Sequence, residues 1–222
     1  MNESILFPIR LTFQVAIVST FLTAIFGIII AYILATRNFK GKILLEIIIT
    51  LPLILPPTVT GYYLILIFGR NGIIGNLIFK LTEWNIMFTW WACVLASFIV
   101  SLPLMVKTAE AAIKSLDKTM IDTSYTLGYS EIQTAIKIVL PLAKNGIIAG
   151  IVLSFARSMG EFGATLMLAG NIPGRTNTMP LAIYSLVSSG EWDKTHLLVL
   201  ILTISSTLFL LLTYKLGKSK NC

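Results

Sequence analysis

Five apolar runs, each long enough to cross a lipid bilayer, dominate this chain of 222 residues. They cover approximately residues 11–36, 43–69, 85–106, 142–169 and 195–214. A membrane-spanning helix needs about 20 predominantly apolar residues. Hydrophobic residues make up 56% of the chain and charged residues 12%, whereas soluble domains carry roughly 25% charged residues. We therefore expect an all-α integral membrane protein, with five transmembrane helices in a single domain over residues 1–222.

The distribution of lysine and arginine predicts the orientation of these helices. One set of loops holds Arg37, Lys40, Lys42, Lys107, Lys114, Lys118, Lys137, Lys144, Lys215, Lys218 and Lys220, and the opposite set holds Arg10, Arg70, Lys80, Arg175 and Lys194. Cytoplasmic loops of membrane proteins are enriched in these residues. We therefore expect the first set to be cytoplasmic, with the N-terminus outside and the C-terminus inside.

The remaining composition argues against several functions. The net charge of +7 is spread over short clusters and forms no basic patch, so we expect no nucleic-acid partner. Cys93 and Cys222 form neither a disulfide framework nor a metal-ligand spacing. The chain also lacks a phosphate-binding loop. We expect no metal, no cofactor and no enzymatic activity of its own.

The second apolar run contains Pro52, Pro56 and Pro57. Proline removes a backbone donor and kinks or breaks a helix. In lipid, such a break survives only where protein or a water-filled cavity covers the freed backbone groups. The prolines therefore indicate either a kink that improves packing or a broken helix that lines a pathway, together with the neighbouring Thr58.

A polar segment over about residues 115–141 separates the third and fourth runs. Asp117 is a suitable N-cap for a short helix ending near Leu127, with Gly128 as the residue after its C-cap. Ser130 and Gln133 match a capping box that opens a second helix ending near Leu140, with Pro141 opening the fourth span.

Apolar side chains of this segment are available to a partner: Met120, Ile121, Tyr125 and Leu127. We expect a compact knob that docks in the groove of a partner protein. The alternative is a segment that lies on lipid headgroups through its lysines.

Arg157 and Glu161 lie one helical turn apart near the middle of the fourth apolar run. A charged side chain within the membrane costs about 2.5–3.5 kcal/mol or more, so it needs a partner and faces protein or a cavity. The two residues are either a structural ion pair or part of a path for an anion.

The segment 122–141 resembles the coupling loop of ABC importer permeases. Asp122 holds the acidic position of that pattern, Thr123 and Ser124 the two small positions usually filled by alanine, Gly128 the glycine, and Ile138, Leu140 and Pro141 its tail. Three further stretches resemble molybdate permeases, at 51–64, 68–76 and 155–184.

The resemblance implies a homodimeric permease in the prokaryotic cytoplasmic membrane. It also implies two copies of a separate ABC ATPase and an extracytoplasmic molybdate-binding protein as partners. It assigns ATPase coupling to Asp122, Tyr125, Gly128, Ile138, Leu140 and Pro141. We place the translocation path or core pair at Arg157, Glu161, Pro56, Pro57 and Thr58.

Three alternatives remain open at the level of the sequence. Sulfate and thiosulfate permeases share the same strings, and tungstate is not separable from molybdate. A self-contained secondary anion carrier would need no docking loop and is favoured by internal repeats, which we do not find. A structural membrane adaptor would have little use for a proline-rich span or an intramembrane ion pair.

Overall fold

The computed structural model describes residues 3–218, and the ends beyond them, including Lys220 and Cys222, lie outside the described residues. The described residues form helices and no strand. In chain order the elements are α1 (Glu3–Thr36), α2 (Lys42–Ile54), α3 (Pro57–Phe68), α4 (Ile73–Thr82), α5 (Trp90–Lys114), α6 (Lys118–Thr126), α7 (Glu131–Thr134), the π-helix η1 (Ala135–Val139), α8 (Leu140–Leu142), α9 (Lys144–Met159), α10 (Gly163–Ala169), α11 (Met179–Ser188) and α12 (Trp192–Lys218).

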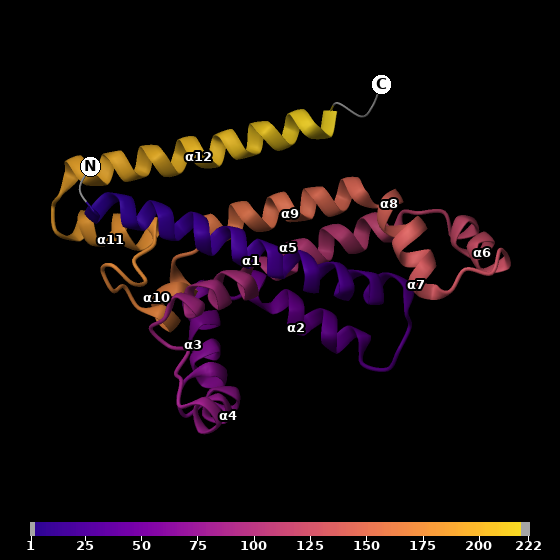
Figure 1. Ribbon diagram of the computed structural model, residues 1–222, viewed down its shortest axis with the longest axis horizontal. Coiled ribbons are helices and arrows are strands. Elements are labelled where there is room, and N and C mark those ends of the chain that lie inside the picture. Colours follow the sequence, from indigo (N-terminus) through magenta and orange to yellow (C-terminus); the bar gives the residue numbers. More distant parts are fainter. Residues whose placement is uncertain (1–2, 219–222) are drawn as a thin grey trace.

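Helices α1, α5 and α9 form the centre of the molecule and lie alongside one another (Figure 1). Small polar side chains join them: the Thr23 and Ser101 hydroxyls share a 3.0 Å hydrogen bond, and the Ser154 hydroxyl donates to the Ser101 carbonyl at 3.4 Å. Small side chains allow helices to approach closely in lipid, where no hydrophobic effect drives helices together. The bundle therefore depends on close packing and on hydrogen bonds between helices.

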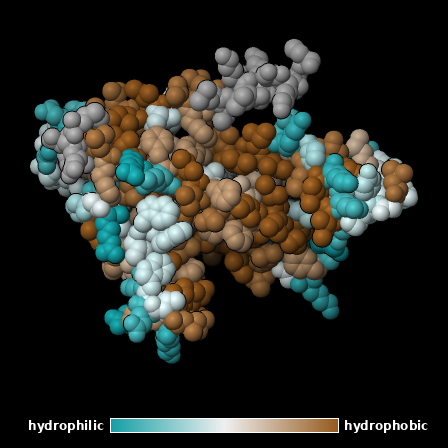
Figure 2. Space-filling model, in the orientation of Figure 1, coloured by the Kyte–Doolittle hydropathy of each residue, from teal (hydrophilic) through white to brown (hydrophobic). Residues whose placement is uncertain are grey.

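An apolar surface covers the long helices, and polar side chains gather towards the ends of the molecule (Figure 2). Among the described residues, α1, α5 and α12 are long and apolar enough to cross a membrane by themselves. The number rises to five if each of two bent pairs is counted as one span: α3 with α4, bent by 44°, and α7–α8 with α9, bent by 75°. The start of α1 and the α6–α7 region lie at opposite ends of the longest axis (Figure 1).

The second apolar run, 43–69, is divided between α2 and α3. Helix α2 ends at Ile54, and Pro57 is the first residue of α3. Proline is well suited to the first position of a helix, because that residue has no intrahelical acceptor for its N–H. The prolines therefore break the run at Leu55–Pro56, and α3 turns away from α2 (Figure 1).

The third and fourth runs also differ from their expected extents. Helix α5 begins at Trp90, after the Thr89 cap, and continues past residue 106 to Lys114. Helix α9 ends at Met159, and α10 begins only at Gly163. The sequence did not predict α4. This helix has 10 residues, so its apolar face is much shorter than the apolar runs that predict membrane spans.

Candidate functional site

Helix α6 is closed at both ends by the predicted capping residues. The Asp117 carboxylate accepts a 2.9 Å hydrogen bond from the Thr119 N–H. Hydrogen bonds from Thr119 hold the pKa of Asp117 below its usual value. At the other end, the Tyr129 N–H donates to the Ser124 carbonyl and the Gly128 N–H to the Tyr125 carbonyl, at 3.1 and 3.0 Å. These two bonds form a Schellman motif, in which Gly128 has φ +83°.

The second short helix begins with the predicted capping box. The Gln133 N–H donates to the Ser130 hydroxyl, and the Ser130 N–H donates to the Gln133 side chain. The two short helices are joined by a buried hydrogen bond of 2.8 Å between the Ser124 and Thr134 hydroxyls. Alanine at position 124 would lack this bond, so Ser124 has a structural role here.

Pro141 lies within a continuous helical stretch and does not open a new span as expected. The helix runs from Glu131 to Leu142 and bends by 75° before α9. A π-helical turn, η1, directly precedes Pro141 and includes a hydrogen bond from the Leu140 N–H to the Ala135 carbonyl. A π-turn leaves one backbone carbonyl of the helix without its usual N–H donor. Pro141 has no backbone N–H, so it cannot supply that donor.

We call the segment 117–141 the coupling knob. Around Gly128 it exposes a group of large apolar side chains: Met120, Tyr125, Leu127, Tyr129, Ile132 and Ile136. The sequence did not single out the last three, although they lie close to the predicted corner. Ile121 was expected on this surface but packs against the core of α1, α5 and α9. The Asp122 carboxylate is exposed, whereas Ile138 and Leu140 are half-buried and Pro141 is exposed.

One ion pair attaches the coupling knob to the bundle. Arg37, which follows α1, pairs with Glu131 in the first turn of α7. Both side chains are exposed, so the pair contributes at most about 1 kcal/mol. The packing of Ile121 and Leu140 against the bundle adds an apolar attachment.

Arg157 and Glu161 form the predicted pair, with 2.8 Å between Arg157 Nη1 and Glu161 Oε2. They do not lie on one continuous helix, because α9 ends at Met159. The Glu161 side chain is only 1% exposed, and its Oε1 accepts a 2.8 Å hydrogen bond from the Ala164 N–H. Glu161 therefore holds the start of α10 and the end of α9 at once, whereas the Arg157 side chain is 28% exposed.

The breaks in the second and fourth apolar runs lie against each other. A methyl group built on Gly163, the first residue of α10, would come within 2.7 Å of Pro57 Cβ, so the backbones meet at a distance that only glycine permits. Pro56, Pro57 and Thr58 are exposed on the neighbouring surface. The fold thus brings together the broken second and fourth apolar runs, which contain the residues expected to line the path.

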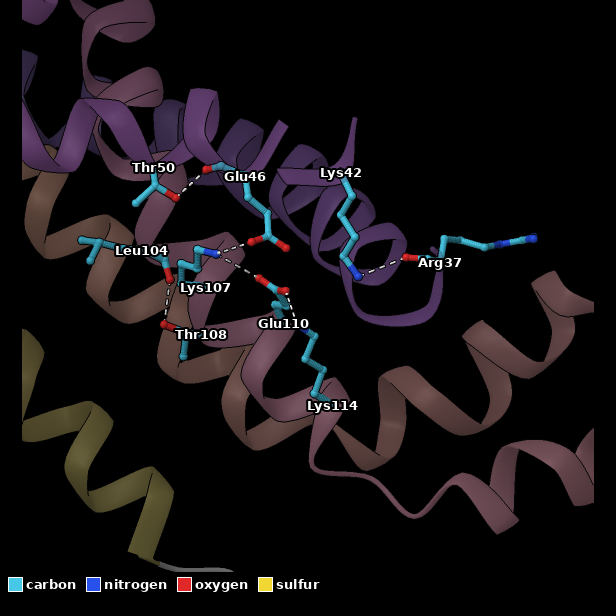
Figure 3. A network of polar contacts seen from close by, with 9 residues as sticks. All are labelled: Arg37, Lys42, Glu46, Thr50, Leu104, Lys107, Thr108, Glu110 and Lys114. Carbon is cyan, nitrogen blue, oxygen red and sulfur yellow. Dashed lines mark hydrogen bonds and ion pairs between the residues drawn. The ribbon is translucent and has the colours of Figure 1, made fainter. Parts of the chain in front are cut away.

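Sequence reasoning missed a cluster of alternating charges where α2 approaches α5 (Figure 3). Lys107 Nζ lies 3.7 Å from Glu46 Oε2 and 3.4 Å from Glu110 Oε2, and Lys114 Nζ lies 2.6 Å from Glu110 Oε1. Glu110 is 4% exposed. The three- and four-residue spacings of Glu110 from Lys107 and Lys114 could have predicted the contacts within α5. No local pattern indicated the contact with Glu46.

The chain matches a family model described as the binding-protein-dependent transport system inner membrane component, over residues 23–218. A molybdenum transport system permease protein of Haemophilus influenzae is 40% identical over 95% of this chain and 92% of its own length. One from Escherichia coli K12 is 38% identical over 89% of this chain and 87% of its own length. A sulfate transport system permease protein of Escherichia coli K12 is 30% identical over 94% of this chain and 75% of its own length.

Solved structures show the same fold at low sequence identity. A bacterial ABC transporter involved in alginate import superposes with a TM-score of 0.79 at 13% identity, covering all of this chain and 82% of that one. An inward-facing methionine ABC transporter gives 0.77 at 15% identity and covers 99% of both chains. By its family match and its relatives, this chain belongs to the inner membrane components of binding-protein-dependent transport systems.

Proposed function

We propose that this chain is the membrane subunit of an ATP-driven importer for molybdate. The observation that carries the proposal is its 38–43% identity to several molybdenum permeases, each over most of its length. The sulfate permease is less similar and is matched over a smaller share of its length. This difference favours molybdate over the alternative, a sulfate or thiosulfate permease.

The coupling knob is the proposed docking point for a separate ATPase chain. Its capped helices and Gly128 corner fix its shape, and its exposed apolar side chains supply area that a groove could bury. A knob held by capping bonds, a buried hydroxyl pair and an ion pair moves with the bundle. Asp122 and Tyr125 lie on its exposed surface, whereas Ile138 and Leu140 are half-buried.

A second copy of the chain completes the proposed path. In the single chain, the non-helical backbone at Leu55–Pro56 borders exposed surface. Lipid cannot satisfy such backbone groups, so another protein surface or water must cover them. We place the path at this face, beside Pro57, Thr58 and Arg157, with an external binding protein that delivers the oxyanion. In this orientation we expect the larger set of loop lysines and arginines to be cytoplasmic, on the same side as the coupling knob.

Uptake by intact cells tests the substrate. Deletion of the gene should abolish uptake of radiolabelled molybdate at low concentration, and a plasmid copy should restore it. Excess tungstate should compete with molybdate, and excess sulfate should compete weakly. If sulfate uptake is lost and molybdate uptake is unchanged, the sulfate alternative replaces the proposal.

A further inference from the structure

Helix α2 connects the end of the molecule that carries the coupling knob to the break at Pro56, and few contacts hold it. Ile49 is its one buried residue. Among the described residues, one polar contact joins α2 to α5, the 3.7 Å pair between Lys107 and Glu46. The nearby Thr50 and Thr108 hydroxyls donate to carbonyls of their own helices, so they do not bridge the two (Figure 3).

The charges around this contact are arranged so that it can open at low free-energy cost. Lys107 is shared between Glu46 on α2 and Glu110 on α5. Glu110 is buried and requires a cation, but Lys114 also contacts it, at 2.6 Å. An unpaired buried charge is strongly destabilising. Here, separation of α2 from Lys107 leaves Glu110 paired, and the two groups that separate are 42% and 30% exposed to solvent.

The contact also lies between the two parts of the chain that transport must link. Helix α5 ends at Lys114, shortly before Asp117 caps the first helix of the coupling segment. Helix α2 ends at Ile54, directly before the break and the exposed Pro57. A movement of α2 against α5 therefore changes the position of the break relative to the coupling knob.

We propose that Lys107 is a positioning residue: through Glu46 it sets where α2 lies against α5, and it thereby links docking at the coupling knob to the position of the break at Pro56. The link to transport rests on the proposed function, whereas the positioning of α2 does not. Glu46 is the partner that opens and closes, and Lys114 keeps Glu110 paired in both arrangements.

The test uses the full transporter with its ATPase in liposomes. Spin labels at Ile43→Cys on α2 and Ala111→Cys on α5, both exposed positions, report the separation of the helices. The native cysteines are replaced beforehand. Glu46→Gln removes only the contact between the helices and leaves both lysines on Glu110, so the variant should fold normally.

We compare Glu46→Gln and Lys107→Met with the conservative Lys107→Arg. The matched control is Glu191→Gln. It removes the partly exposed ion pair between Glu191 and Lys194, which are three residues apart and remote from α2 in the sequence. Glu46→Gln and Lys107→Met should lower the ratio of native to separated label distances about two- to fivefold, as expected for a partly exposed ion pair. Oxyanion uptake per ATP hydrolysed should fall by a similar factor, while Lys107→Arg and the control stay near wild type.

Two results would overturn the proposal: an unchanged label distance in Glu46→Gln, or a changed distance with normal uptake per ATP. A failure of the proposed function would give a different result from a failure of this inference. In that case the wild-type complex would transport no oxyanion, although the label distances would still depend on Glu46.

Discussion

Replacement of Arg157 should destabilise the protein more than simultaneous replacement of Arg157 and Glu161. The Glu161 carboxylate is 1% exposed, so Arg157→Met leaves an uncompensated buried charge. Loss of one partner of a buried ion pair costs roughly 3–5 kcal/mol. Because Arg157 itself is 28% exposed, we expect about 3 kcal/mol, the lower end of that range.

The second substitution is Glu161→Gln, because glutamine keeps the oxygen that accepts the hydrogen bond from the Ala164 N–H. It removes the buried charge without removing this contact at the start of α10. The double variant should therefore regain about 2 kcal/mol of the loss, since a neutral amide is far easier to bury than a carboxylate. Lys194→Met, in the exposed pair with Glu191, is the control and should change stability by less than about 1 kcal/mol.

The assay combines the free energy of unfolding, from SDS titration in mixed micelles, with uptake in cells. A double variant that is no more stable than Arg157→Met would show that an uncompensated charge on Glu161 is not the cause of the loss. Recovery of uptake in the double variant would exclude a required contact between Arg157 and the anion. A double variant that is stable but inactive would show that Arg157 serves the path directly.

The coupling knob and the topology give three further predictions. Gly128→Val should leave membrane levels near normal but abolish uptake and co-purification of the ATPase, because φ +83° disfavours a β-branched residue; Gly128→Asn, which tolerates this conformation better, should retain partial function, and normal uptake by the valine variant would rule out the docking role. Ser124→Ala should lower stability by about 1 kcal/mol, because the buried Thr134 hydroxyl loses its partner; an equal loss in Thr123→Ala, an exposed neighbour, would argue against this cause. In a cysteine-free background, an impermeant maleimide should label Glu191→Cys in intact cells and Lys118→Cys only after permeabilisation; the reverse pattern would contradict the predicted orientation.

Local rules predicted the parts of the site that depend on local chemistry. Asp117, Gly128 and Ser130 have the capping roles expected from their residue types, because helix ends are determined within a few residues. The break at Pro56 follows from proline chemistry in the same way. The ion pair of Arg157 was predicted from the i,i+4 spacing, and it forms although the helix ends between the two residues.

Features that depend on tertiary contacts could not be read from the sequence. The approach of Pro57 to Gly163 joins residues that are far apart in the chain. Glu46 meets Lys107 only because α2 folds back along α5. The start of α5 at Trp90 depends on a turn in which Phe88 has φ +60°, a conformation that apolar periodicity does not indicate. Ile121 faces the core because of how α6 sits against the bundle.

Transport by the reconstituted complex shows whether this chain works as the membrane subunit of an ATP-driven importer. The chain is placed in liposomes with its ATPase and its binding protein, and accumulation of radiolabelled molybdate is measured with and without ATP. We predict accumulation that requires ATP and the ATPase chain and that is lost in Gly128→Val. Accumulation driven by an ion gradient in liposomes that contain this chain alone would rule out an ATP-driven importer and identify a self-contained carrier.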